Sequence, residues 1–240
     1  MEMNKLGVIG GLGPMATAYF YQLIVQMTEA STDQEHIETI IYSRPATPDR
    51  TKFILGKSKE DPMPFLLDAG RKLKRQGANV IAIPCITAHY FQKRLEKTLG
   101  TRVIHAIEET GKYLKHRNIH TVGIMATDGT VESKLFQTIL GKYNIECVTP
   151  EKEGQEKVMH LIYKDVKSGK PVEMDLFESV SKELFDAGAQ VILLGCTELS
   201  LIKRDYTLGK GFLDVMEVLA RQAVISCGRL KEEYNELITE

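Results

Sequence analysis

The chain has 240 residues, of which 43% are hydrophobic and 26% charged, as in an ordinary globular protein of one large domain or two small ones. A formal net charge of −1 excludes a general nucleic-acid binder, and no apolar run approaches the ~20 residues that cross a bilayer. Four cysteines without a C-x-x-C pair, and no N-terminal signal, predict a cytoplasmic protein with reduced thiols and no structural zinc.

The first half of the chain alternates short apolar runs with amphipathic segments. Pro14 suits the first turn of a helix, and Gly77 suits the end of one. Two prolines stiffen the loop 43–51, which suits a loop that holds a side chain in place. In chain order the pattern predicts strand 5–10, helix 16–28, strand 37–42, helix 63–76, strand 77–84, a helix from about 88, strand 103–104 and helix 107–115.

The second half repeats this alternation. The pattern predicts strand 121–125, helix 131–140, strand 145–148, helices on either side of 167–171, strand 188–195, strand 212–213 and helix 215–227. Residues 229–240 are too charged for a core and are expected to form a solvated helix or a partner surface. Strands that alternate with helices in this way indicate βαβ units and parallel sheets.

Two of the predicted strands are copies of each other. Residues 77–85 and 188–196 both open with Gly-Ala, continue as an apolar run and reach a cysteine, at a constant offset (196 minus 85 is 111). We therefore expect an α/β fold of two similar lobes, 1–117 and 118–228, each a parallel sheet flanked by helices. A pseudo-two-fold axis would relate the lobes, the active site would lie in the cleft between them, and a polar tail, 229–240, would follow. A final helix that folds back across the first lobe is the alternative to this division.

The two strands end at Cys85 and Cys196. Ligands of parallel sheets bind beyond the carboxyl ends of the strands, so both thiols are expected to face one crevice. Thr87 and Thr197 are expected to cap the helices that follow, whose N-termini would lower a thiol pKa and bind a carboxylate. A thiolate and a thiol on opposite faces of a carbon can remove a proton from one side and deliver one from the other. A lone cysteine is more often a small hydrophobe, and the unrepeated Cys147 and Cys227 are assigned to packing.

Four motifs carry a resemblance to a known family. The segments 10–14 (GGLGP), 48–51 (PDRT), 84–89 (PCITAH) and 195–199 (GCTEL), in this order, resemble the aspartate/glutamate racemase family from about residue 5 to residue 225. The resemblance implies an amino-acid racemase that works without pyridoxal phosphate, any other cofactor or a metal, acts on aspartate or glutamate, and forms a homodimer.

The resemblance also implies roles for individual residues. Cys85 and Cys196 would be the catalytic acid and base, and Arg50 would bind the side-chain carboxylate of the substrate through two parallel hydrogen bonds. The full substrate-binding set would be Met15, Arg50, Ile86, Thr87, Thr127, Lys167, Thr197 and Glu198. The family usually has asparagine at the position of Ile86, which can donate no hydrogen bond, so the identity of the amino acid stays open.

Two alternatives remain at this level. A non-catalytic protein that binds small dicarboxylates or amino acids would explain Ile86. An NADP-dependent oxidoreductase would explain Gly11–Ala16, which matches G-x-G-x-x-A after a strand, with Arg44 taking the phosphate where an acidic residue is usual. Glu198 also suits the first turn of a helix, and His89 is expected to be a hydrogen-bonded core residue without a metal companion.

Overall fold

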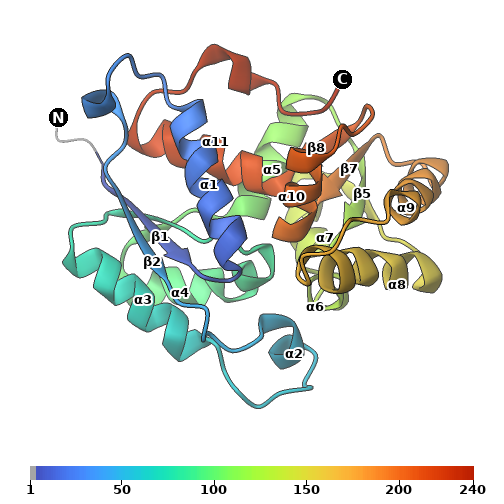
Figure 1. Ribbon diagram of the computed structural model, residues 1–240, viewed down its shortest axis with the longest axis horizontal. Helices are drawn as coiled ribbons and strands as arrows, with labels where there is room; N and C mark the ends of the chain where they lie inside the picture. The colour runs from blue at the N-terminus through green and yellow to red at the C-terminus, as the bar shows by residue number, and fades with distance from the viewer. Residues whose placement is uncertain (1–3) are drawn as a thin grey trace.

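Two four-stranded parallel sheets form the framework of the computed structural model, which describes residues 4–240 (Figure 1). The first sheet has the order β2-β1-β3-β4 and the second the order β6-β5-β7-β8, so the two sheets have the same topology. The strands are β1 (Leu6–Gly10), β2 (Thr39–Ser43), β3 (Val80–Ala82), β4 (Arg102–Val103), β5 (Thr121–Met125), β6 (Glu146–Val148), β7 (Val191–Leu194) and β8 (Phe212–Asp214). The predicted fold class, two α/β lobes with parallel sheets, is confirmed.

Helices cover both sheets. They are α1 (Pro14–Met27), α2 (Arg50–Ile54), α3 (Met63–Arg75), α4 (Gln92–Leu99), α5 (Ala106–His116), α6 (Asp128–Glu132), α7 (Leu135–Leu140), α8 (Lys152–His160), α9 (Met174–Asp186), α10 (Thr197–Asp205) and α11 (Val215–Cys227). Helix α3 packs on β1 and β2, and α9 packs on β5 and β7. None of the helices within residues 4–240 is long and apolar enough to span a membrane.

Helix α11 joins the two halves. It follows β8 in the second sheet, yet it packs against α1 and α5 as well as against β3, β7 and β8 (Figure 1). The largest core cluster accordingly includes Val8 of the first sheet, Val122 of the second and Leu219 of α11. Because this core is shared, the division into 1–117, 118–228 and 229–240 stays a prediction.

Several boundaries differ from those expected. The loop after β2 ends at Asp49, which caps α2, so Arg50 begins a helix. The expected helix 131–140 is two short helices, because Lys134 has a positive φ of 51° between them. The segment after Cys85 is first a 3-10 helix, η2 (Ile86–Phe91), and becomes α-helical only at Gln92.

The C-terminal segment packs on the protein, and its expected form as a solvated helix is wrong. Leu230 forms a bridge with Thr28, and a short 3-10 helix, η5 (Glu232–Asn235), follows. Leu237 is buried in the largest core cluster. Thr239 exchanges backbone hydrogen bonds with Gly211 and Phe212 beside β8. The charged residues of the segment 229–240 gave no indication of these contacts, which are made by Leu237 and by backbone groups.

Candidate active site

Cys85 and Cys196 line one small cavity, although they follow strands of different sheets. Cys85 lies beyond the carboxyl end of β3 and Cys196 beyond that of β7, and both side chains are buried. The cavity is lined by Leu12, Asp49, Arg50, Thr51, Cys85, Ile86, Thr87, Thr127, Tyr163, Lys167, Cys196, Thr197 and Glu198. It therefore lies where parallel sheets place ligands, between residues from both halves of the chain.

The cavity is tight. About 20 Å³ is open to the centres of water molecules, and about 10–15 Å³ of such space holds one water. An amino acid is several times larger than a water molecule. A ligand of that size therefore requires the walls of the cavity to move apart before it can enter.

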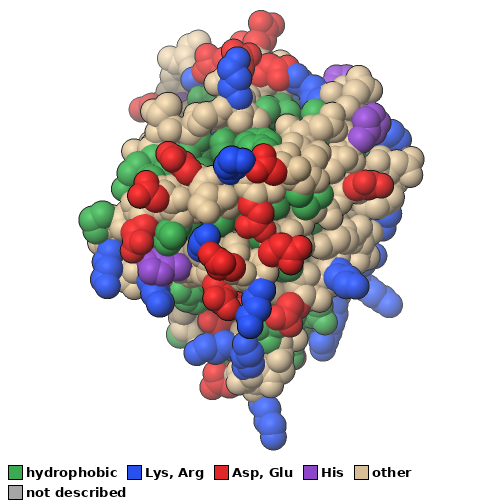
Figure 2. Space-filling view, turned by 90° about the vertical axis from the view of Figure 1, so that its right-hand side faces the viewer, with side chains coloured by type: hydrophobic (Ala, Val, Ile, Leu, Met, Phe, Trp, Pro, Cys, Tyr) green, Lys and Arg blue, Asp and Glu red, His purple; other side chains and the backbone are tan. Residues whose placement is uncertain are grey.

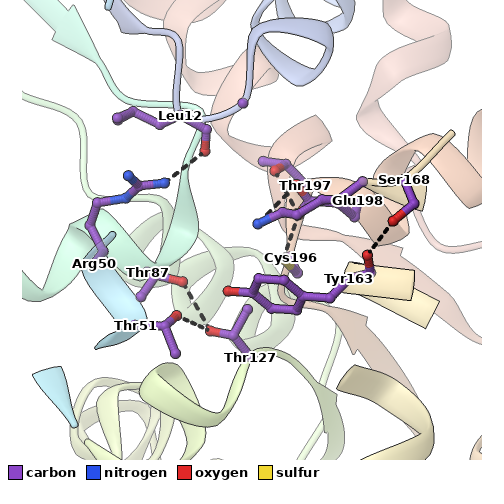
Figure 3. A network of polar contacts seen from close by, with 12 residues as sticks. Leu12, Arg50, Thr51, Thr87, Thr127, Tyr163, Ser168, Cys196, Thr197 and Glu198 are labelled. Carbon is purple, nitrogen blue, oxygen red and sulfur yellow. Dashed lines mark hydrogen bonds and ion pairs between the residues drawn. The ribbon is translucent and has the colours of Figure 1, made fainter. Parts of the chain in front are cut away.

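Cys196 is hydrogen-bonded to a carboxylate. Its Sγ donates to Oε2 of Glu198 at 2.8 Å, and the hydroxyl of Thr197 donates to the same oxygen at 3.3 Å (Figure 3). Burial, followed by the negative charge of Glu198, raises the pKa of Cys196 well above its ordinary value, although Lys167 acts in the opposite direction. The expectation that the helix N-terminus lowers this pKa is wrong, because burial and a neighbouring carboxylate outweigh the helix.

The cysteines themselves occupy the N-cap positions. Cys196 precedes the first residue of α10, and Cys85 precedes η2. Thr197 is therefore the first helical residue, and Thr87 lies inside η2. The predicted threonine caps are wrong, and the hydroxyls of both threonines are turned to other partners.

Lys167 lies between an aromatic ring and Glu198. Its Nζ is 4.3 Å from the centre of the Tyr163 ring and 3.5 Å from Oε1 of Glu198. Burial lowers the pKa of Lys167, but the negative charges around it, Glu198 first, outweigh burial and raise it. The ammonium group is therefore a stable positive charge in the cavity wall. Its long contact with Glu198 leaves it able to bind a second carboxylate.

Arg50 is held by backbone carbonyls. Its Nη1 donates to the oxygens of Thr47 and Pro48 at 3.2 and 2.9 Å, and its Nη2 donates to the oxygen of Leu12 at 3.4 Å (Figure 3). Burial lowers the pKa of Arg50, but interaction with Cys85, and then with Asp49 and Tyr163, raises it overall. The guanidinium is therefore a fixed positive charge in the wall of the cavity that Cys85 also lines.

Four threonine hydroxyls, three of them in the cavity wall, connect the two halves of the chain. The Oγ1 atoms of Thr87, Thr127 and Thr130 are 3.1 Å from one another. Thr51 donates to Thr127 at 3.3 Å (Figure 3). Thr51 and Thr87 come from the first half and the other two from the second. Hydroxyls both donate and accept, so this group can turn toward a ligand without losing every internal bond.

The structure brings together nine of the ten predicted site residues. Met15 is the exception: it lies in the first turn of α1, is 61% exposed and does not line the cavity. Ile86 lines the cavity and also packs in the largest core cluster. His89 is buried with Nε2 3.1 Å from the oxygen of Ile83, and burial lowers its pKa to about 3, so it stays neutral.

The other two cysteines pack in the core. Cys227 is buried, and Cys147 packs against the same cluster. Burial raises the pKa of Cys147 to about 12 and that of Cys227 to about 11. Both therefore stay protonated near neutral pH.

The sequence did not identify Tyr163, Asp49 or Thr51 as residues of the cavity. Tyr163 lies four residues before Lys167, a spacing that places two side chains on one face of a helix, so it could have been found from Lys167. Asp49 and Thr51 flank Arg50 in the motif 48–51. No pattern in the sequence marks Thr51 as a partner of Thr127.

The glycine-rich turn has a structural explanation. Gly11 has a φ of 87°, and a Cβ there would lie 2.4 Å from the backbone nitrogen of Arg44. The glycine thus allows β1 to approach the end of β2. Arg44 pairs with Asp68 at 2.8 Å and stacks on Phe65. The glycine turn and Arg44, which suggested a nucleotide-binding site, therefore both make contacts within the protein.

Comparisons with known proteins identify one family. A family model described as Asp/Glu/Hydantoin racemase matches residues 9–223. The chain is 25% identical over 230 residues to the broad specificity amino-acid racemase RacX of Bacillus subtilis (strain 168), covering 91% of this chain and 96% of that protein. The structure is similar to the aspartate racemase of Picrophilus torridus, with a TM-score of 0.79, 29% identity, and coverage of 96% of this chain and 98% of that one.

A more distant structure has the same fold. Glutamate racemase from Francisella tularensis, solved with D-glutamate, superposes with a TM-score of 0.64 at 18% identity, covering 92% of this chain and 80% of that one. At this identity the likeness concerns the fold alone.

Proposed function

The chain belongs to the Asp/Glu/hydantoin racemase family and is an amino-acid racemase, and we propose that it inverts the α-carbon of aspartate or glutamate with Cys85 and Cys196 as the two acid/base groups. The observation that carries this proposal is that both thiols line one small cavity from separate sheets. A single carbon held there can meet one sulfur on each face.

The neighbours of each sulfur guide the assignment of roles. Cys196 donates to Glu198 and is assigned as the acid. Cys85, which interacts with the guanidinium of Arg50, is assigned as the base that acts as a thiolate. The Cys85 thiolate removes the α-proton, which breaks a C–H bond and forms an S–H bond. The thiol of Cys196 then delivers its proton to the opposite face of the carbanion and is left as a thiolate.

One turnover thus leaves the two sulfurs with exchanged protonation states. The product enantiomer can react in reverse from this state, which accounts for catalysis in both directions. The Cys196 thiolate lies beside the carboxylate of Glu198, so this state is the less stable of the two. The cycle is completed when Cys85 loses the proton that it gained and Cys196 takes up a proton in its place.

The carboxylates of an acidic amino acid require positive charge and hydrogen-bond donors. We assign the side-chain carboxylate to Arg50 and charge balance to Lys167, the two cations of the cavity wall. Ile86 offers no side-chain donor, so the hydroxyls of Thr87, Thr127 and Thr197 remain for the α-carboxylate. The N-terminus of α10 adds favourable electrostatics as carbanion character develops.

Assays with a panel of amino acids would determine the substrate range. The name of the Bacillus subtilis relative describes a broad specificity. The apolar side chain of Ile86 makes no directional hydrogen bond that would favour one substrate over another. Aspartate and glutamate should therefore be compared with neutral and basic amino acids, each as the separate enantiomers. The two cations predict the highest kcat/KM for the acidic pair. A preference for basic amino acids would contradict this assignment.

Substitution of each cysteine tests the two-base chemistry. The variants Cys85→Ser and Cys196→Ser should each lose racemisation by about 10²–10⁴-fold, the usual contribution of an acid or base group. Chiral chromatography measures racemisation, and NMR in deuterated water measures exchange of the α-hydrogen. Each variant should still exchange the α-hydrogen of one enantiomer, a different one in each case, because one working base remains.

The core thiol at position 227 provides the control. Cys227→Ser, outside the cavity, should racemise at close to the wild-type rate per folded molecule. Full racemisation by either Cys85→Ser or Cys196→Ser would end the two-base proposal, while membership of the family would stand.

The proposal extends to a cytoplasmic homodimer. Tyr21 and Val25 on α1 and Ile225 on α11 are exposed apolar side chains on two helices that pack together, which supports contact with a second copy. Sedimentation of the purified protein measures the oligomeric state directly.

A further inference from the structure

A second cluster of chemically active side chains lies outside the candidate active site. His160, Asp165 and Glu173 each direct one ligand atom into a common space, and these atoms lie within 4.8 Å of one another. The Nε2 atom of His160 is 3.2 Å from Oδ1 of Asp165 and 3.1 Å from Oε1 of Glu173. None of the three lines the cavity that contains the cysteines.

The backbone explains how these residues meet. His160 ends α8, and the chain continues as a π-helix, η4 (Leu161–Val166). A π-helix bonds residue i to residue i+5, so it places His160 and Asp165 on the same side. Glu173 is the N-cap of α9, and its backbone N–H donates to Oδ2 of Asp165 at 3.1 Å. The other carboxylate oxygen of Asp165 is left to face the imidazole.

The cluster carries more negative than positive charge. The Asp165 side chain is only 4% exposed, and a buried carboxylate needs a partner charge. Within residues 4–240, neither Asp165 nor Glu173 forms an ion pair with a lysine or an arginine. A fully protonated His160 would balance only one of the two carboxylates. The surrounding face, which includes α8 and α9, carries acidic and basic side chains interspersed (Figure 2).

Two of the three separations within the cluster are close to those of a metal site. Zinc bonds to nitrogen and oxygen ligands are about 2.0–2.1 Å, so two ligand atoms of a tetrahedral ion lie about 3.3 Å apart. The two measured separations from His160, 3.2 and 3.1 Å, are close to this value. A donor set of one imidazole and two carboxylates suits zinc and similar ions, whereas magnesium and calcium prefer oxygen alone.

We propose that His160, Asp165 and Glu173 bind a divalent transition-metal ion, with zinc as the preferred ion and water as the fourth ligand. The imidazole and Glu173 also line a surface groove of about 820 Å³, which gives the ion and its water a path to solvent. Binding requires only that the imidazole be neutral and that its nitrogen turn from the oxygens to the ion.

The position of this site connects it to the cysteine cavity. Asp165 lies between Tyr163 and Lys167, which both line that cavity. An ion held by His160, Asp165 and Glu173 would tie the end of α8 to the start of α9. It would therefore fix the segment 161–173, which carries one wall of the candidate active site. The binding site itself does not depend on the proposed reaction.

Titration calorimetry with zinc chloride tests the proposal on chelator-treated, fully reduced protein. We expect one zinc ion per chain in addition to any bound by the catalytic thiols. His160→Gln and Glu173→Gln should each weaken this ion at least tenfold. Glu156→Gln removes a carboxylate from the same groove but not from the cluster, and it should leave the affinity unchanged.

The thiols of the cysteine cavity are the competing ligands, so Cys85→Ser is titrated in parallel. It should retain the ion that His160→Gln loses. Cobalt replaces zinc in a second measurement, where the visible spectrum of a nitrogen and oxygen site lacks the thiolate charge-transfer band. Wild-type affinity in both cluster variants, with loss of the ion in Cys85→Ser, would overturn the proposal. Absence of binding at micromolar zinc would show an ordinary histidine–carboxylate contact and would also overturn it.

Discussion

The proton on Cys196 is held by a carboxylate two residues further along the chain. Because Cys196 is the N-cap of α10, its side chain and that of Glu198 point into the same cavity, and Sγ donates to Oε2 at 2.8 Å. This contact distinguishes the two sulfurs, since Cys85 faces the cation of Arg50. Two residues that look equivalent in the sequence repeat therefore have different polar neighbours.

Removal of the charge on Glu198 should lower the pKa of Cys196. In Glu198→Gln the thiolate loses a repulsive neighbour, while the attraction of Lys167 remains. The pH profile of Cys196 alkylation by iodoacetamide, measured by peptide mass spectrometry, should move to lower pH. The Cys85 profile in the same sample is the internal control. An unchanged Cys196 profile would show that burial alone holds its proton.

Asp214 should make the stability of the protein depend on pH. Its side chain is buried and accepts bonds from Ser200 and Met216 on Oδ1, while Oδ2 has no partner among residues 4–240. Burial and then the charge of Glu217 raise its pKa to about 7. A carboxyl pKa that is higher in the folded state means that the folded chain holds the proton more tightly. The stability from this group is therefore full below about pH 4 and is lost as the pH rises to about 7.

Asp214→Asn keeps the oxygen that accepts both bonds and cannot ionise. Relative to wild type, its free energy of unfolding should rise by roughly 2–3 kcal/mol between pH 5 and pH 8, measured by urea denaturation. Asp186→Asn, which changes an exposed carboxylate on α9, is the control and should follow wild type. Equal pH dependence of Asp214→Asn and wild type would contradict the raised pKa.

Single residues of the site were predictable where a motif fixed them. Cys85 and Cys196 follow from the repeated pattern at two strand ends, whereas Arg50 and Lys167 were expected from the resemblance to the racemase family. Tyr163 lies four residues before Lys167, so it was predictable only from the assignment of Lys167 and not from a motif of its own. Met15 was expected in the substrate-binding set, yet its side chain on α1 is exposed to solvent.

Among the elements, the strands were the most predictable. The strands that end at the cysteines have strictly apolar cores, because both faces of a parallel sheet are covered. The short segments between β3 and α4 and between β5 and β6 were less predictable. There the backbone follows local contacts, such as the positive φ of Lys134, which hydrophobic periodicity does not record.

The turn after β1 should depend on its glycine. Gly11→Ala places a Cβ both at a φ of 87° and 2.4 Å from the backbone of Arg44, so at least about 2 kcal/mol of unfolding free energy should be lost. Gly56→Ala is the matched comparison, since Gly56 has a φ of 68° and no atom within 4 Å of a Cβ. It should lose only about 1 kcal/mol. Equal losses in urea denaturation would show that close packing against Arg44 contributes nothing.

The whole molecule encloses a cavity smaller than its substrate. Walls from both halves of the chain meet through Thr51, Thr87, Thr127 and Thr130, and about 20 Å³ remains between them. The two-lobed architecture was predictable from the repeat. The closeness of the lobes was not, because it depends on side chains that lie far apart in the sequence.

Substrate should restrain both halves together. At saturating substrate, amide hydrogen exchange in residues 43–51 and 161–173 should slow at least about tenfold, because a ligand that touches both lobes opposes their separation. Mass spectrometry of peptides measures this, with α3 as the internal control. Slower exchange in only one of the two segments would contradict a site shared between the lobes.

The last residues of the chain limit how copies of the protein can assemble. Thr239 bonds to Gly211 and Phe212, so the outer side of β8, the edge strand of the second sheet, already has a backbone partner. An edge strand that is covered in this way cannot template a strand from another molecule. A continuous sheet through β8 is thus closed to a second copy, and a dimer must form through other surfaces.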